Sequence, residues 1–101
     1  MVEIIRPLTV NTSAVTQGAS TDANRTSITF QNTHATAEVY LSSNPNVTTT
    51  TGIRIPPGAV ITFAREYGDD PTLNYYLISD TISTPVIALD GYGNIPTLTK
   101  R

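Results

Sequence analysis

The chain has 101 residues, a length that fits one domain built around a single hydrophobic core. Charged residues make up only 14% of it, and the absence of cysteine excludes disulfides and thiolate metal sites. The net charge is −2 and the six Lys and Arg residues are scattered, so we expect no nucleic-acid partner.

The first ten residues are expected to be extended. Residues 2–5 and 8–10 have strand-like composition and are separated by Pro7, which favours an edge or a bend because it lacks an N–H group. Neither a leader with a basic start and an apolar run nor a stretch of 18 apolar residues is visible, so we expect no secretion signal and no membrane partner.

The centre of the chain alternates polar and apolar residues between turns. A polar loop over residues 17–24 precedes the clearest strand, residues 25–31, in which Ile28 and Phe30 share one face. Further strands are predicted in the following segments: residues 38–42, 47–51, 53–55 and 60–64. Pro56-Pro57-Gly58 predicts a type II turn, because glycine adopts a positive φ without strain.

The last third adds two apolar segments. Residues 74–79 are apolar on both faces, which is typical of a central strand or a subunit contact, and residues 85–89 form another strand. About eight short strands without an amphipathic helix predict an all-β fold: a single small antiparallel β-sandwich of jelly-roll or Ig-like topology. We expect one domain over residues 1–101, with an N-terminal arm at 1–10 and an extended C-terminal tail at 94–101.

Residues suited to catalysis or metal binding are few. The single histidine, His34, lies in a predicted turn without a recognisable nucleophile motif, and we expect it to be exposed to solvent. Glu66, Asp69 and Asp70 would offer oxygen ligands to Ca²⁺ but lack the spacing of an EF-hand loop, so a solvated loop is the simpler reading. We therefore predict a protein that is not an enzyme and needs no cofactor or metal.

Five tyrosines and no tryptophan suggest a binding surface, since tyrosine buries a ring and keeps a polar group. Tyr40 lies opposite the apolar Val39/Leu41 face and should point outward. The two terminal segments would be able to add a strand to the sheet edge of a neighbouring molecule. The predicted interface residues are Val2, Ile4, Ile5, Leu8, Tyr40, Tyr92, Ile95 and Leu98.

Several motifs follow one another in a definite order: a strand ending in Gln-Asn, a Val-Tyr strand, a hairpin with Pro-Pro-Gly, an Ile-Ser-Asp strand and a final core strand. Their residues are Asn24-Arg25-Thr26-Ser27-Ile28-Thr29-Phe30-Gln31-Asn32, Val39-Tyr40-Leu41, Val47-Thr48, Gly52-Ile53-Arg54-Ile55-Pro56-Pro57-Gly58, Tyr76-Leu77-Ile78-Ser79-Asp80 and Val86-Ile87-Ala88-Leu89-Asp90-Gly91-Tyr92. This order, which spans about two-thirds of the chain, resembles small all-β structural proteins of tailed-bacteriophage virions.

The resemblance implies a β-sandwich that decorates or cements a capsid, or that forms part of a tail or fibre. Our leading hypothesis is a non-enzymatic subunit on the outer surface of a virion, which self-associates and docks on the major capsid protein lattice. The alternative is an adhesion module of a tail or fibre that binds host-surface carbohydrate. In that case Tyr40, Tyr67 or Tyr92 would stack on sugar rings beside Asn and Asp side chains.

Overall fold

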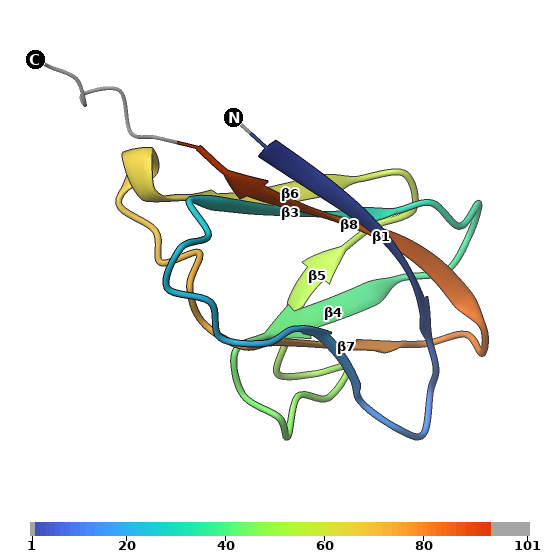
Figure 1. The fold of residues 1–101 in the computed structure, drawn as a ribbon. Helices are drawn as coiled ribbons and strands as arrows, with labels where there is room; N and C mark the ends of the chain where they lie inside the picture. The colour runs from blue at the N-terminus through green and yellow to red at the C-terminus, as the bar shows by residue number, and fades with distance from the viewer. Residues whose placement is uncertain (1, 94–101) are drawn as a thin grey trace, which may run out of the picture.

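The computed structural model describes residues 2–93, with the exception of the Val2 side chain. Two four-stranded antiparallel sheets pack face to face, and the described residues form one β-sandwich (Figure 1). A short 3₁₀ turn, η1 (Arg65–Tyr67), follows strand β6. The predicted all-β sandwich is confirmed.

The first sheet has the strand order β1-β8-β3-β6. Its strands are β1 (Val2–Val10), β8 (Thr84–Tyr92), β3 (Ser27–Asn32) and β6 (Val60–Ala64). The second sheet has the order β2-β7-β4-β5. Its strands are β2 (Thr16–Ala19), β7 (Tyr75–Ser79), β4 (Val39–Ser42) and β5 (Ile53–Ile55). These two orders are those of an eight-stranded jelly roll, which decides between the two predicted topologies.

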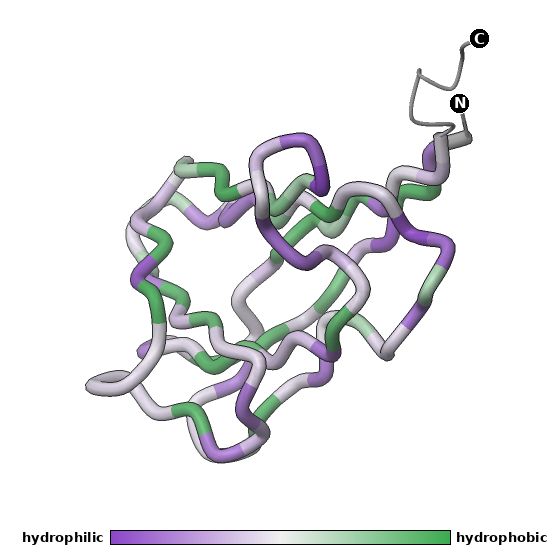
Figure 2. Tube along the Cα trace, turned by 90° about the vertical axis from the view of Figure 1, so that its left-hand side faces the viewer, coloured by the Kyte–Doolittle hydropathy of each residue, from purple (hydrophilic) through white to green (hydrophobic). Residues whose placement is uncertain are grey.

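The core lies between the sheets and follows from the period-2 pattern of the strands. Hydrophobic and hydrophilic residues alternate along the chain (Figure 2), so each strand turns one row of side chains inward. Phe30, Leu41 and Leu77 are completely buried. The Tyr75 ring meets Phe30 edge to face at 5.9 Å and stacks on Phe63 at 5.0 Å, which joins the two sheets.

Two local predictions are wrong and one is confirmed. Residues 47–51 form no strand but a turn, in which the Thr51 N–H donates to the Thr48 carbonyl. The polar loop predicted over residues 17–24 in fact begins with β2, a strand too short and too rich in small residues to be recognised. Gly58 has the positive φ of 76° predicted for the Pro-Pro-Gly turn, and the Ala59 N–H donates to the Pro56 carbonyl.

The predicted N-terminal arm is instead part of the sandwich. Strand β1 pairs with β8 along its whole length, from Val2 opposite Tyr92 to Val10 opposite Thr84. Pro7 does not interrupt it, because β1 is an edge strand and one side of its backbone needs no partner. Residues 94–101, the predicted tail, lie outside the described residues.

Candidate functional site

The outer face of the β1-β8-β3-β6 sheet carries two rows of uncharged side chains. Directly opposed residues of neighbouring strands share a face, and the strand registers therefore define the rows. The rows are Ile5–Leu89–Thr29–Thr62 and Pro7–Ile87–Gln31–Val60, and we call these eight residues the uncharged face. Removal of water from such a surface by a partner costs little free energy, because no charged group has to be desolvated.

Apolar groups on this face are open to solvent at both edges of the sheet. Ile5 on β1 is 68% exposed and Val60 on β6 is 54% exposed, while Ile87 and Leu89 between them are half-buried. The Thr29 and Thr62 hydroxyls are 2.9 Å apart and satisfy each other. The uncharged face is thus a mildly apolar sheet surface, in which two of the polar side chains are already hydrogen-bonded to each other.

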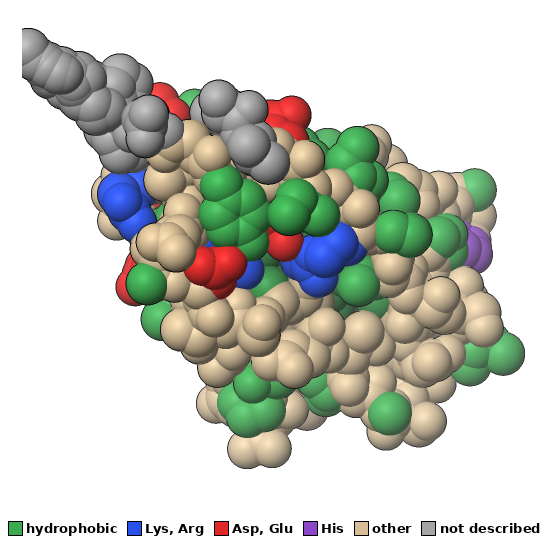
Figure 3. All heavy atoms as spheres, in the orientation of Figure 1, with side chains coloured by type: hydrophobic (Ala, Val, Ile, Leu, Met, Phe, Trp, Pro, Cys, Tyr) green, Lys and Arg blue, Asp and Glu red, His purple; other side chains and the backbone are tan. Residues whose placement is uncertain are grey.

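Glu3 borders the uncharged face on β1, in the row next to Ile5. Other charged side chains, acidic and basic, lie side by side on the surface nearest the viewer in Figure 3. Arg6 donates two hydrogen bonds to the buried Asp90 carboxylate, at 2.8 and 2.9 Å. The Tyr92 hydroxyl donates to Asp22 Oδ2 at 2.7 Å. This bond is the main cause of the lowered pKa of Asp22, and it raises the pKa of Tyr92. These groups are occupied in holding the β2–β3 loop and β1 against β8.

Arg25 is the other polar residue that organises this end of the sandwich. Its buried guanidinium donates to the Pro71 carbonyl at 2.7 Å, to Leu73 at 2.9 Å and to Ser20 at 3.0 Å. The side chain therefore ties the β2–β3 loop to the β6–β7 loop. Its hydrogen bonds are internal, so its role is structural.

The outer face of the β2-β7-β4-β5 sheet is aromatic and partly charged. Tyr40 and Ile78 are directly opposed, and Tyr76 lies beside them on β7; we call these three residues the tyrosine face. Arg54 forms an ion pair with Glu38 at its border, which lowers the pKa of the Glu38 carboxyl. All three side chains of the tyrosine face are half-buried, and the Tyr40 hydroxyl donates to Glu38 Oε1 at 3.4 Å.

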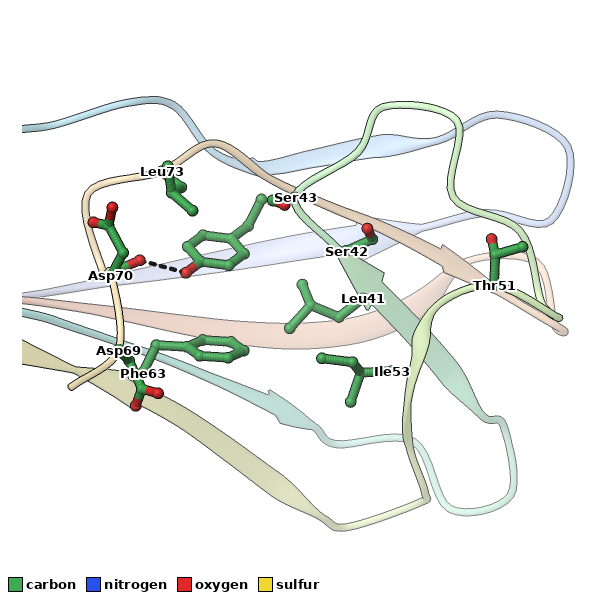
Figure 4. A pocket seen from close by; sticks show the side chains of 10 residues that line it. Leu41, Ser42, Ser43, Thr51, Ile53, Phe63, Asp69, Asp70 and Leu73 are labelled. Carbon is green, nitrogen blue, oxygen red and sulfur yellow. Dashed lines mark hydrogen bonds between the residues drawn. The ribbon is translucent and has the colours of Figure 1, made fainter. Parts of the chain in front are cut away.

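A groove of about 340 Å³ opens between the edge strands β5 and β6. Figure 4 shows Leu41, Ile53, Phe63 and Leu73 pointing into it. The Tyr75 hydroxyl donates to the Asp70 carbonyl at 2.6 Å at one end. Its volume is at the lower end of the range of ligand pockets, about 300–1,000 Å³.

The structure separates the predicted interface residues. Ile5 is on the uncharged face, and Tyr40 is on the tyrosine face. Ile4 is exposed on the opposite side of β1 from Ile5, whereas Leu8 packs against the core. Tyr92 is half-buried and bonded to Asp22. The side chain of Val2 and all of Ile95 and Leu98 fall outside the described residues.

The sequence did not point to most of the uncharged face. Thr29 and Gln31 lie on the face of the clearest strand opposite Ile28 and Phe30, and the alternation of that strand does not show which residues of other strands lie beside them. In the fold, Thr29 is paired with Leu89 and Gln31 with Ile87 on β8, although the paired residues are about 60 positions apart in the sequence. No local pattern shows which strands will lie side by side.

His34 has a structural role rather than an exposed position. Its Nδ1 accepts hydrogen bonds from the backbone N–H groups of Thr36 at 3.0 Å and Ala37 at 2.9 Å, and the side chain is half-buried. Within residues 2–93, no three or more His, Asp or Glu side chains are grouped so as to hold a metal ion. The described part of the chain also contains no helix long and apolar enough to cross a membrane.

Comparison with known proteins identifies no relative: no protein family, no curated protein and no solved structure matches the chain.

Proposed function

We propose that this protein is a structural subunit of a virus particle that docks on the major capsid protein through its uncharged face, decorating and stabilising the outer surface of the shell. The observation that carries the proposal is the composition of this face: eight contiguous positions on four strands, none of them charged, with exposed Ile5 and Val60 at its edges. A contiguous surface that carries no charge and exposes aliphatic side chains at its edges costs little to desolvate, which suits a protein contact site.

The size of the face suits a repeating partner. Two rows of four residues, on strands about 4.8 Å apart and with rows about 6.6 Å apart, cover roughly 250 Å². A standard interface buries about 800 Å² on each partner, so one such contact is weak. A lattice compensates for weak contacts because several linked copies bind at once and gain avidity, which also favours self-association of the subunits.

The resemblance of the motifs to phage virion proteins agrees with this proposal, as does the jelly-roll topology, which is common in viral capsid domains. The fold by itself is only an analogy, because jelly rolls also occur in lectins and enzymes. The uncharged face adds to this analogy a defined set of residues through which the subunit would dock.

The direct experiment is a quantitative protein inventory of purified particles of the virus whose genome encodes the chain. We expect the chain in a fixed ratio to the major capsid protein, and in density at repeated positions on the outer surface. A chain that is encoded outside any viral genome or prophage, or that is missing from the particles, would contradict the proposal.

The tyrosine face favours a second candidate, carbohydrate binding by a tail or fibre module. Tyr40 and Tyr76 present aromatic rings beside polar groups of Gln17 and Arg54, a combination that stacks on and hydrogen-bonds to sugars. A glycan array distinguishes the candidates: binding that is lost on Tyr76→Ala and retained on Ile5→Lys would support the carbohydrate module over the docking subunit.

A further inference from the structure

The groove between β5 and β6 has an apolar interior that the described residues leave open to solvent. Leu41, Phe63 and Tyr75 form its floor, while Ile53 on one side is 50% exposed and Leu73 on the other is 41% exposed. An apolar group that covers aliphatic side chains this exposed lowers the free energy, because their apolar surface is removed from water.

One end of this groove is acidic. Asp69 Oδ2 accepts a hydrogen bond from the Ala64 N–H at 3.2 Å, and Asp70 Oδ1 accepts one from the Thr72 N–H at 3.0 Å, so both carboxylates are fixed in place. The hydrogen bonds from Thr72 are the main reason that the pKa of Asp70 is lowered, which keeps its charge. Arg65 is the nearby cation, and its guanidinium donates a long hydrogen bond of 3.4 Å to the Ala23 carbonyl.

The charges of the chain are divided between the sandwich and the tail. All eight Asp and Glu residues lie within residues 2–93, together with only four of the six basic residues. Of these four, Arg6 and Arg54 are in ion pairs and Arg25 is buried. The two remaining basic residues, Lys100 and Arg101, end the segment Asn94-Ile95-Pro96-Thr97-Leu98-Thr99-Lys100-Arg101. This segment therefore combines aliphatic side chains with the charge opposite to that of the groove.

The length of the segment fits the distance to the groove. Phe63 pairs with Ile28, and Ile28 with Asp90, so Phe63 on the floor lies two strands away from β8 and three residues back from Gly93. With strands about 4.8 Å apart and a rise of about 3.3 Å per residue, this path is roughly 14 Å long. Leu98 is five residues beyond Gly93, and an extended chain of that length spans about 16–18 Å.

We propose that residues 94–101 occupy the groove of their own chain, with Leu98 on the apolar floor and the two cations within about one Debye length, roughly 8–10 Å, of Asp69 and Asp70. The segment then covers the exposed side chains of Ile53 and Leu73. This proposal does not depend on the proposed function, because it needs no partner molecule.

Paired cysteines test this occupancy cleanly, since the chain has none of its own. The test variant combines Ile53→Cys with Leu98→Cys. The control combines Thr62→Cys with Leu98→Cys, because Thr62 is exposed on the opposite side of β6 from Phe63 at a similar distance from Gly93. Under mild oxidation we expect the test pair to form an intramolecular disulfide about tenfold faster than the control, owing to its higher effective concentration.

Mass spectrometry and a non-reducing gel separate the outcomes. Equal rates for the two pairs would overturn the proposal, and so would a disulfide-linked dimer as the main product, because it would place the tail on a second copy. Addition of Asp69→Asn and Asp70→Asn to the test pair should slow its closure, and high salt should do the same. A second pair, Leu73→Cys with Leu98→Cys, should behave like the first and guards against a local effect at Ile53.

Discussion

At the scale of single residues, Arg25 determines whether two loops stay together. Its guanidinium is buried, and it donates to the backbone carbonyls of Pro71 and Leu73 in the β6–β7 loop and of Ser20 in its own β2–β3 loop. Replacement by Met removes the donors and leaves carbonyls without partners, so we expect Arg25→Met to lower the free energy of unfolding by about 2–4 kcal/mol. Urea denaturation measures this. Arg65→Met is the control and should change it by less than about 0.5 kcal/mol, because Arg65 is exposed.

The hydrogen bond between Tyr92 and Asp22 makes part of the stability depend on pH. The folded pKa of Asp22 is below its ordinary value of 3.8, so the contribution is complete above that value and is lost as pH falls through the lowered pKa. The pKa of Tyr92 is raised above 10.0, so at high pH the contribution is lost as pH rises through the raised value. We expect Tyr92→Phe to lower the Tm at pH 7 and to have little effect at pH values well below the lowered pKa.

Tyr67→Phe is the matched control for this pH series, since Tyr67 is an exposed tyrosine of η1. Its Tm should follow that of the unmodified protein at every pH. A Tyr92→Phe effect of the same size in acid and at neutral pH would mean that ring packing, and not the bond to Asp22, stabilises the fold.

Local residue patterns predicted the core well and the surface poorly. Ile28, Phe30 and Leu41 are buried as their alternation indicated, because inward and outward positions are fixed within one strand. The environments of Leu8 and Tyr92 depend instead on strands and loops distant in sequence, such as the bond between Tyr92 and Asp22, 70 residues away. No local pattern contains that information.

At the scale of elements, β2 reaches the core only because Gly18 has no side chain. A Cβ atom at Gly18 would lie 2.6 Å from Leu77 Cδ1 and 2.9 Å from Phe30 Cε1, both in the buried core. We expect Gly18→Ala to lower the free energy of unfolding by about 1–3 kcal/mol, as overpacking usually does. Chemical denaturation measures the change. Ser20→Ala, one residue beyond β2 and exposed, should leave it nearly unchanged.

Strand β1 is required for folding, in contrast to the arm that the sequence suggested. Deletion of residues 1–10 would remove the fully buried Val10 and leave the nine-residue strand β8 without one of its two neighbours. We expect this truncation to lose cooperative thermal unfolding and dispersed NMR signals. Deletion of residues 94–101 leaves all eight strands in place and should retain both. A folded chain after the first deletion would show that β1 is dispensable.

At the scale of the whole molecule, the number of strands was predictable and their order was not. Turn residues mark where each strand ends, and that signal is local. The jelly-roll order places β1 beside β8 and β3 beside β6, so that residues from four separate segments form one surface. The uncharged face therefore exists only in the folded protein.

The most direct test of this face is cosedimentation of the purified protein with particles that lack it. Ile5→Lys introduces a charge on the uncharged face, while Ile82→Lys introduces the same charge in the β7–β8 turn; the two isoleucines are 68% and 69% exposed, so neither change should disturb folding. We expect Ile5→Lys to reduce the bound fraction about tenfold or more, because a charge without a partner must be desolvated on binding. Ile82→Lys should bind like the unmodified protein. Equal binding of both variants would contradict docking through the uncharged face.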